Sequence, residues 1–215
     1  MGCSGGGSGE APSGVQWPQG TVLVCAGDPI RADEVDPIAE ALKPLGPKFT
    51  QPHLRRLALT NVRLPLAAGR AQGGPERREE ARDDAEAFSR STRESGLLPA
   101  GHVPRGGAME MVEGSQDTLG VSLWVLVQGL EVGSWSDVAE LPGQFVVVKL
   151  DERDGNTQPQ RERFTLQVAA FLYVQEPASL PAAALESTLV IVDPAWEPLV
   201  PGFWRYRMRM LGSDR

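Results

Sequence analysis

The chain has 215 residues, of which 41% are hydrophobic and 23% charged, proportions typical of a globular protein that buries a core. Its formal net charge is −7, and no run concentrates Lys and Arg on one face, which argues against a nucleic-acid-binding protein driven by phosphate contacts. No apolar run approaches the roughly 20 residues of a membrane-spanning helix. Peptides, small ligands and protein partners all remain compatible with this composition.

Residues 1–19 open with "MGCSGGGSGE", a Gly- and Ser-rich tether that buries no apolar surface and is predicted to be disordered. Cys3, near its start, is similar to the first residue of mature bacterial lipoproteins, where "GC" closes the lipobox. If a signal peptide precedes Met1, we expect a lipid on Cys3 and a location on the periplasmic side of the bacterial cell envelope. The alternative is an unmodified tail on a cytoplasmic protein.

The first predicted strand is "TVLVC", which leads into a Gly-Asp-Pro turn. Cys25 ends this strand, and a buried, unreactive thiol is the expected state of such a residue. Cys3 is the only other cysteine, so the chain has neither a disulfide framework nor the ligand spacing of a metal site. No metal or cofactor is therefore expected.

Three helices are predicted after this strand. The first is "DPIAEALKPL", with Asp36 as N-cap and Pro37 at its first helical position. The second should kink or end at Pro65. The third, residues 76–95, is mostly charged, so most of its surface is expected to face solvent. Its narrow apolar stripe consists of Ala81, Ala85 and Phe88.

Residues 96–116 have no steady period and many Gly and Pro residues, so this segment is predicted to be a flexible loop at an internal domain boundary. The chain beyond it, residues 117–215, is predicted to be rich in β-structure. Its clearest strand follows the tight Pro-Gly turn of "LPGQFVVVKLDE". Two further strands are predicted in "RFTLQVAAFLYV" and "STLVIVD".

The last predicted strand, "FWRYRMRM", alternates strictly over residues 203–210. Apolar residues occupy one face, and Arg205, Arg207 and Arg209 occupy the other. One interpretation is an edge strand that its arginines keep soluble. The other is a surface that binds an acidic partner or lipid headgroups.

Two stretches of the chain together resemble a known family. "TVLVCAGDPIRADEVDPIAEALKPL" resembles the opening of SurA-type periplasmic chaperones, with an apolar strand, a "GDPI" turn and a helix. "TLGVSLWVLVQGLEVGSWSDVAELPGQFVVVKLDERD" is similar to the second half of a parvulin-type peptidyl-prolyl isomerase, through Leu119-Gly120, "LEVGSWSDV" and "PGQFVVVKLDE". The resemblance implies an α+β fold. A mostly helical SurA-like region over residues 20–95 would precede a parvulin-like antiparallel or mixed sheet with flanking helices over residues 117–215.

The resemblance also allows the family's site to be compared residue by residue. The family's proline pocket combines Met, Leu and Phe side chains with two histidines, and here Phe145 stands where the last strand should carry a histidine. The segment between Gly120 and Leu130 is too short to hold the pocket's Met and Phe. His53 and His102 lie at a helix start and in a loop, where solvated or capping roles are expected. We predict no catalytic residue, and the predicted peptide-binding residues are Leu119, Leu123, Trp124 and Phe145.

These observations lead to three hypotheses. The first is an extracytoplasmic folding factor that binds unfolded or extended polypeptide by strand addition, with weak or absent prolyl isomerase activity. The second is an active isomerase with a rebuilt site, in which Asp117, Ser122 and Trp124 supply an apolar slot and hydrogen bonds. The third is a structural or adaptor lipoprotein that docks a partner through the arginines of its last strand.

Overall fold

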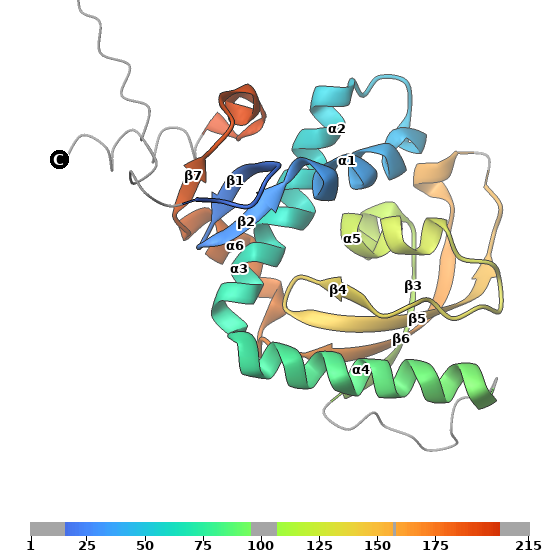
Figure 1. The fold of residues 1–215 in the computed structure, drawn as a ribbon. Helices are drawn as coiled ribbons and strands as arrows, with labels where there is room; N and C mark the ends of the chain where they lie inside the picture. The colour runs from blue at the N-terminus through green and yellow to red at the C-terminus, as the bar shows by residue number, and fades with distance from the viewer. Residues whose placement is uncertain (1–15, 96–106, 157, 203–215) are drawn as a thin grey trace, which may run out of the picture.

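A computed structural model describes residues 16–95, 107–156 and 158–202. Within these ranges the fold is α+β, as predicted: two antiparallel sheets carry the strands, and helices pack around them (Figure 1). The helices are α1 (Ala32–Ala41), α2 (Gln51–Ala58), α3 (Leu64–Gly73), α4 (Pro75–Ser95), α5 (Gln116–Gln128) and α6 (Leu180–Glu186).

The smaller sheet joins the two ends of the described chain. Its strand order is β2-β1-β7, and both pairings are antiparallel. The central strand β1 is buried at all five of its residues, which explains its unbroken apolar run. The strand predicted in "STLVIVD" therefore pairs with β1 and not with the larger sheet. The three strands are β1 (Thr21–Cys25), β2 (Asp28–Arg31) and β7 (Leu189–Ile191).

The larger sheet has the order β3-β6-β5-β4 and is antiparallel throughout. Its central strands β5 and β6 confirm the strands predicted in "LPGQFVVVKLDE" and "RFTLQVAAFLYV". The long helix α4 packs on one face of this sheet, and α5 lies on the other (Figure 1). The four strands are β3 (Gly107–Gly114), β4 (Ala139–Leu141), β5 (Gln144–Arg153) and β6 (Phe164–Leu172).

Strand β3 contradicts part of the loop predicted over residues 96–116. Residues 96–106 lie outside the described ranges, but residues 107–114 pair with β6 along their whole length. The helix α5 then begins at Gln116. The prediction was wrong because the apolar residues of β3 do not alternate strictly and Gly residues flank them. Pairing with β6 supplies the stability that the local pattern does not indicate.

Helix α1 begins before its predicted cap. Arg31 is the N-cap residue, and its backbone N–H donates a hydrogen bond to the Glu34 carboxylate at 2.9 Å. The predicted cap, Asp36, instead accepts two hydrogen bonds from Arg55 of α2, at 2.6 and 2.9 Å. Pro37 therefore lies inside the helix and not at its first position.

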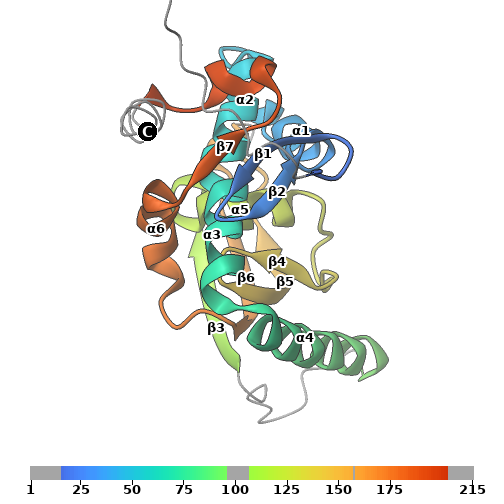
Figure 2. The same ribbon diagram turned by 60° about the vertical axis from the view of Figure 1, so that its left-hand side comes forward.

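A π-helical turn over Leu59–Arg63 joins α2 and α3 end to end (Figure 2). At the end of this turn the Leu64 backbone N–H donates to the Leu59 carbonyl, which is the i→i+5 bond of a π-helix. Pro65 has no N–H to continue the ordinary pattern, and the wider turn accommodates it. Contrary to one predicted outcome, the helix does not end at Pro65 but continues to Gly73.

Helix α4 rests on the larger sheet through the predicted apolar stripe. Ala81, Ala85 and Phe88 are all buried. The Phe88 ring packs against Phe171 and Trp135, with 5.8 Å between ring centroids in both pairs. The stripe belongs to a hydrophobic cluster that also contains buried residues of β1, β5 and β6. The two sheets therefore share one core.

Candidate functional site

Three of the four predicted peptide-binding residues lie on α5. Leu119 and Leu123 are half-buried, and Trp124 is fully buried. Asp117 and Ser122, the residues considered for a rebuilt isomerase site, lie on opposite sides of a kink in α5 at Gly120, and Asp117 is exposed whereas Ser122 is half-buried. Trp124 is therefore part of the core, and its ring presents no surface to a ligand in this conformation.

The fourth predicted residue, Phe145, lies on the other face of the sheet. It is 5% exposed, pairs with Phe171 of β6 and packs against the Tyr173 ring at 5.7 Å between centroids. Phe171 in turn contacts Phe88 of α4, so this face of the sheet is the one that α4 covers. A hollow of about 250 Å³ remains beside Phe145. Its lining residues are Pro75, Arg78, Glu79, Arg82 and Phe145. The four predicted residues therefore do not line one common pocket.

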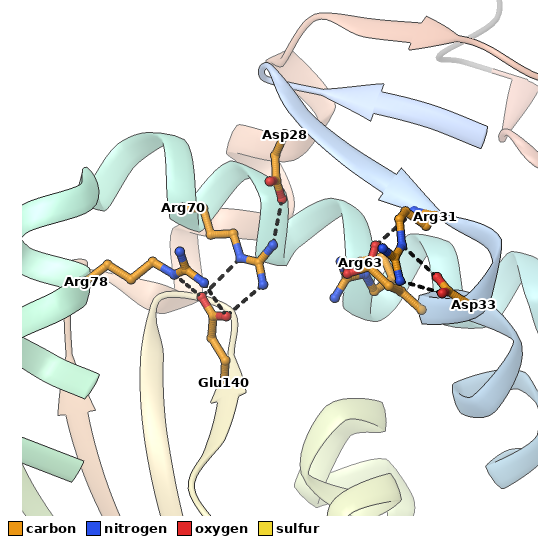
Figure 3. A network of polar contacts seen from close by, with 8 residues as sticks. Asp28, Arg31, Asp33, Arg63, Arg70, Arg78 and Glu140 are labelled. Carbon is orange, nitrogen blue, oxygen red and sulfur yellow. Dashed lines mark hydrogen bonds and ion pairs between the residues drawn. The ribbon is translucent and has the colours of Figure 1, made fainter. Parts of the chain in front are cut away.

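A charged network next to this hollow ties β4 to the N-terminal half of the chain (Figure 3). Glu140 of β4 accepts hydrogen bonds from Arg70 of α3, at 2.7 and 3.1 Å, and from Arg78 of α4, at 2.6 and 3.0 Å. Arg70 also donates to Asp28 of β2 at 3.0 Å. The Tyr173 hydroxyl donates to Glu140 at 3.2 Å. The network thus connects both sheets with α3 and α4.

The network holds Glu140 as a carboxylate. Burial acts to raise the pKa of Glu140, but the hydrogen bonds and charges of Arg78 and Arg70 outweigh burial and lower this pKa to about 2. Burial and the Glu140 charge together raise the pKa of Tyr173 above its ordinary value. At neutral pH Glu140 is therefore ionised and Tyr173 is protonated. Neither group is poised to exchange protons, so the network is suited to a structural role.

Strand β3 forms an open edge of the larger sheet. One side of β3 pairs with β6, and within the described ranges no strand pairs with its other side. Met111 of this strand is 63% exposed, and Glu110 and Glu113 beside it are also exposed. The outer side of an edge strand presents backbone N–H and C=O groups that an added strand can pair with. This edge can therefore bind an extended polypeptide backbone.

The other residues considered from the sequence provide no further site. Cys25 is buried, as predicted, and burial together with the charge of Asp28 raises its pKa to about 11, so the thiol stays protonated. His53 stacks on the Phe49 ring at 4.9 Å between centroids. Across the described ranges, no group of His, Cys, Asp and Glu side chains could hold a metal ion, and no helix is long and apolar enough to span a membrane. Five of the residues considered from the sequence lie outside these ranges: Cys3, His102, Arg205, Arg207 and Arg209.

Sequence reasoning missed both the Glu140 network and the open edge of β3. The partners of Glu140 are distant in the chain, so the local sequence around this residue carries no signal for the network. The sequence of β3 does contain a short indication of a strand, because Met109, Glu110 and Met111 alternate in polarity. A search for such short alternation inside predicted loops would have found β3.

Comparisons of the chain with protein-family models, with curated proteins and with solved structures find no match. The resemblance to parvulin-type isomerases and SurA-type chaperones therefore stays a prediction from the sequence. The geometry of the chain supplies the structural basis for a functional proposal. That geometry offers a small hollow beside Phe145 and an open strand edge at β3.

Proposed function

We propose that the chain binds unfolded or extended polypeptide by strand addition at the open edge of β3. One observation carries the proposal: an edge strand of eight residues, Gly107–Gly114, on which Met111 is 63% exposed. Strand addition uses the backbone groups that every polypeptide has, so a single edge can accept many sequences. This property suits a protein whose ligands are unfolded chains.

The side chains of β3 support the same role. Natural edge strands are commonly protected from unwanted pairing by charged side chains, especially Lys, or by Pro; β3 carries Glu110 and Glu113 but neither Lys nor Pro. Met109 and Met111 lie on one face of the strand, half-buried and exposed respectively. Methionine side chains are flexible and polarisable, so they adapt to different apolar neighbours on an added strand.

The proposed cellular role is that of an extracytoplasmic folding factor of the parvulin and SurA kind. Its support is the sequence resemblance, together with a Cys3 tether that would hold the chain at a membrane surface if a lipid is attached. Prolyl isomerisation has little or no part in this proposal. Trp124 is fully buried and Phe145 is 5% exposed, so neither presents a wide apolar surface for a proline ring.

Fluorescence anisotropy with a labelled, reduced and carboxymethylated model polypeptide tests the proposal. Met111→Lys places a solvated charge on the open edge, and we expect its dissociation constant to rise about tenfold. Val132→Lys is a matched control, because Val132 is 60% exposed but lies outside the strands. We expect this control to bind within about twofold of the unchanged chain. Equal affinity of the Met111→Lys variant and the unchanged chain would contradict binding at β3.

A prolyl isomerase is the second candidate function, and the hollow of about 250 Å³ beside Phe145 is the observation that favours it. A protease-coupled isomerisation assay on a proline-containing peptide separates the two candidates. Arg82→Ala changes an exposed lining residue and leaves the core intact. A rate enhancement by the unchanged chain that falls in this variant would favour the isomerase. Polypeptide binding without any rate enhancement would favour strand addition alone.

A further inference from the structure

The open edge of β3 presents two faces to an added strand, and they differ most around Met111. Gly107 pairs with Phe171, whose ring packs against Phe88 of α4. Every second residue from Gly107 therefore lies on the α4 face of the sheet, and this set includes Met109 and Met111. The alternate set points to the opposite face. It includes Glu110, which is exposed, and Val112, which is half-buried and packs against the core.

An added strand fits this edge best when its own residues alternate in the same way. Residues that lie directly opposite one another on paired strands share a face of the sheet. An apolar residue opposite Met111 therefore places its two chain neighbours on the Glu110 face. The best partner carries apolar side chains at alternate positions and cationic side chains between them.

The chain contains a segment with this pattern at residues 203–210, "FWRYRMRM", which lies outside the described residues. We propose that this segment of a second copy of the chain adds to β3 and thereby links two copies. With Tyr206 opposite Met111, Arg205 and Arg207 lie on the Glu110 face, where opposite charges attract. This inference rests on the proposed function, because it uses the same open edge, and it names a partner for that edge.

A second copy fits better than the same copy because of where the described chain ends. The last described turn, Pro194–Leu199, packs on β1, β7 and α2, and the Pro198 carbonyl accepts a hydrogen bond from Arg56 at 2.9 Å. From Gly202 to Tyr206 the chain extends at most about 14 Å. Figures 1 and 2 both place β7, with the smaller sheet to which it belongs, at the end of the molecule away from α4. Two copies that exchange segments reciprocally satisfy both edges and close as a dimer.

Such a dimer would regulate the proposed binding activity. The segment and an unfolded polypeptide would compete for the same outer edge of β3. Polypeptide binding is then expected to dissociate the dimer, because one edge accepts one strand at a time. The exchanged segment would also cover Met111 and so protect an exposed apolar edge from aggregation when no ligand is bound.

Sedimentation velocity of the full-length chain over a range of concentrations tests the inference. We expect a dimer, and we expect Glu110→Arg to raise its dissociation constant about tenfold, since this change brings like charges together. Glu113→Arg alters the net charge equally but lies on the Met111 face, and we expect a change below about threefold. Adding Arg207→Glu to Glu110→Arg should restore the dimer, because the opposite charges are then exchanged.

Two results would overturn the inference. One is a chain that remains monomeric at all concentrations, which would also be the outcome if the segment paired within its own copy. The other is an equal effect of Glu110→Arg and Glu113→Arg, which would show that the charged residues do not act through strand alternation. The proposed function is judged separately. A monomeric chain that still loses polypeptide binding in Met111→Lys contradicts the dimer only, whereas a dimer whose polypeptide binding is unchanged in that variant contradicts the proposed function only.

Discussion

The two edges of the larger sheet are built in opposite ways. β4 spans only Ala139–Leu141, and its middle residue, Glu140, is held by hydrogen bonds from Arg70 and Arg78. β3 spans eight residues, and Met111 on it is 63% exposed, with no strand beyond it among the described residues. One edge is fixed to the rest of the fold, and the other presents its backbone for pairing.

The difference between the two edges is that a partly buried ion pair stabilises β4, whereas β3 has exposed side chains at its edge. The side chains of Arg70 and Glu140 are 22% and 14% exposed, so solvent screens their ion pair only in part. Removing one partner of a shielded pair leaves an uncompensated charge, whereas exposed pairs contribute little to stability. We therefore expect substitutions at β4 to alter stability, and substitutions at β3 to alter binding.

Glu140→Gln should cause the largest loss of stability. This change leaves two arginines, Arg70 and Arg78, without their shared carboxylate, and we expect the free energy of unfolding to fall by about 3 kcal/mol. That value is at the low end for buried pairs, because the Arg78 side chain is 37% exposed and can be solvated. Urea unfolding followed by circular dichroism measures the loss.

Asp137→Asn is the matched control for Glu140→Gln. Asp137 pairs with Arg93 at the surface, where the Asp137 side chain is 89% exposed. We expect this variant to lose less than about 0.5 kcal/mol. Similar losses in the two variants would contradict the conclusion that the shielded network, and not surface charge in general, fixes the β4 edge.

Gly73→Ala should disturb the fixed edge from the side of α3. A Cβ atom at Gly73 would meet the Tyr173 ring and lie 2.9 Å from the Tyr173 carbonyl oxygen. The closely packed backbone at Tyr173 cannot move away easily, so we expect the free energy of unfolding to fall by about 2 kcal/mol. Gly129→Ala is the control, since nothing lies within 4 Å of its added Cβ. Thermal unfolding that ranks the two variants as equally stable would argue against close packing of Tyr173 on α3.

Acid should lower the free energy of unfolding by protonating Glu140 on β4, and by less than the two substitutions do. The folded state lowers the pKa of Glu140 to about 2, so the carboxylate stabilises the fold fully above its unfolded pKa of about 4.3. This contribution is lost as the pH falls from there through the folded value. Between about pH 4.5 and 2, the free energy of unfolding should therefore fall more steeply in the unchanged chain than in Glu140→Gln. Urea unfolding at stepped pH tests this, and parallel pH profiles would contradict it.

Met111→Lys should have the smallest effect on stability. An exposed side chain loses little buried surface when it is replaced, so we expect the free energy of unfolding to change by less than about 0.5 kcal/mol. The same variant is expected to bind polypeptide about tenfold more weakly. Urea unfolding that reveals a loss above about 2 kcal/mol would assign Met111 to the folded core instead of a binding edge.

Local sequence patterns predicted the elements whose own residues determine their structure. The buried strand β1 and the long strand β5 follow from their apolar runs, and the stripe of α4 follows from the spacing of Ala81, Ala85 and Phe88. The failures involve partners distant in the chain. Asp36 looks like a helix cap until Arg55 of the next helix occupies its carboxylate. Residues 107–114 look like a loop until β6 pairs with them.

The candidate site was less predictable than the fold for the same reason. Trp124 and Phe145 belong to one sequence pattern, but the structure places Trp124 on α5 and Phe145 on the α4 face of the sheet. Which face a residue occupies depends on strand register, and a motif comparison does not supply register. The open edge depends on strand order, which follows from the pairing of the whole sheet.

Hydrogen exchange of the backbone amides, with and without an unfolded model polypeptide, detects strand addition at β3 directly. Strand addition forms new hydrogen bonds to the outer N–H groups of β3 and leaves β4 unchanged. We predict slower exchange on binding in residues 107–114 and no change in residues 139–141. Protection confined to α5 or to the hollow beside Phe145, with β3 unaffected, would contradict the account.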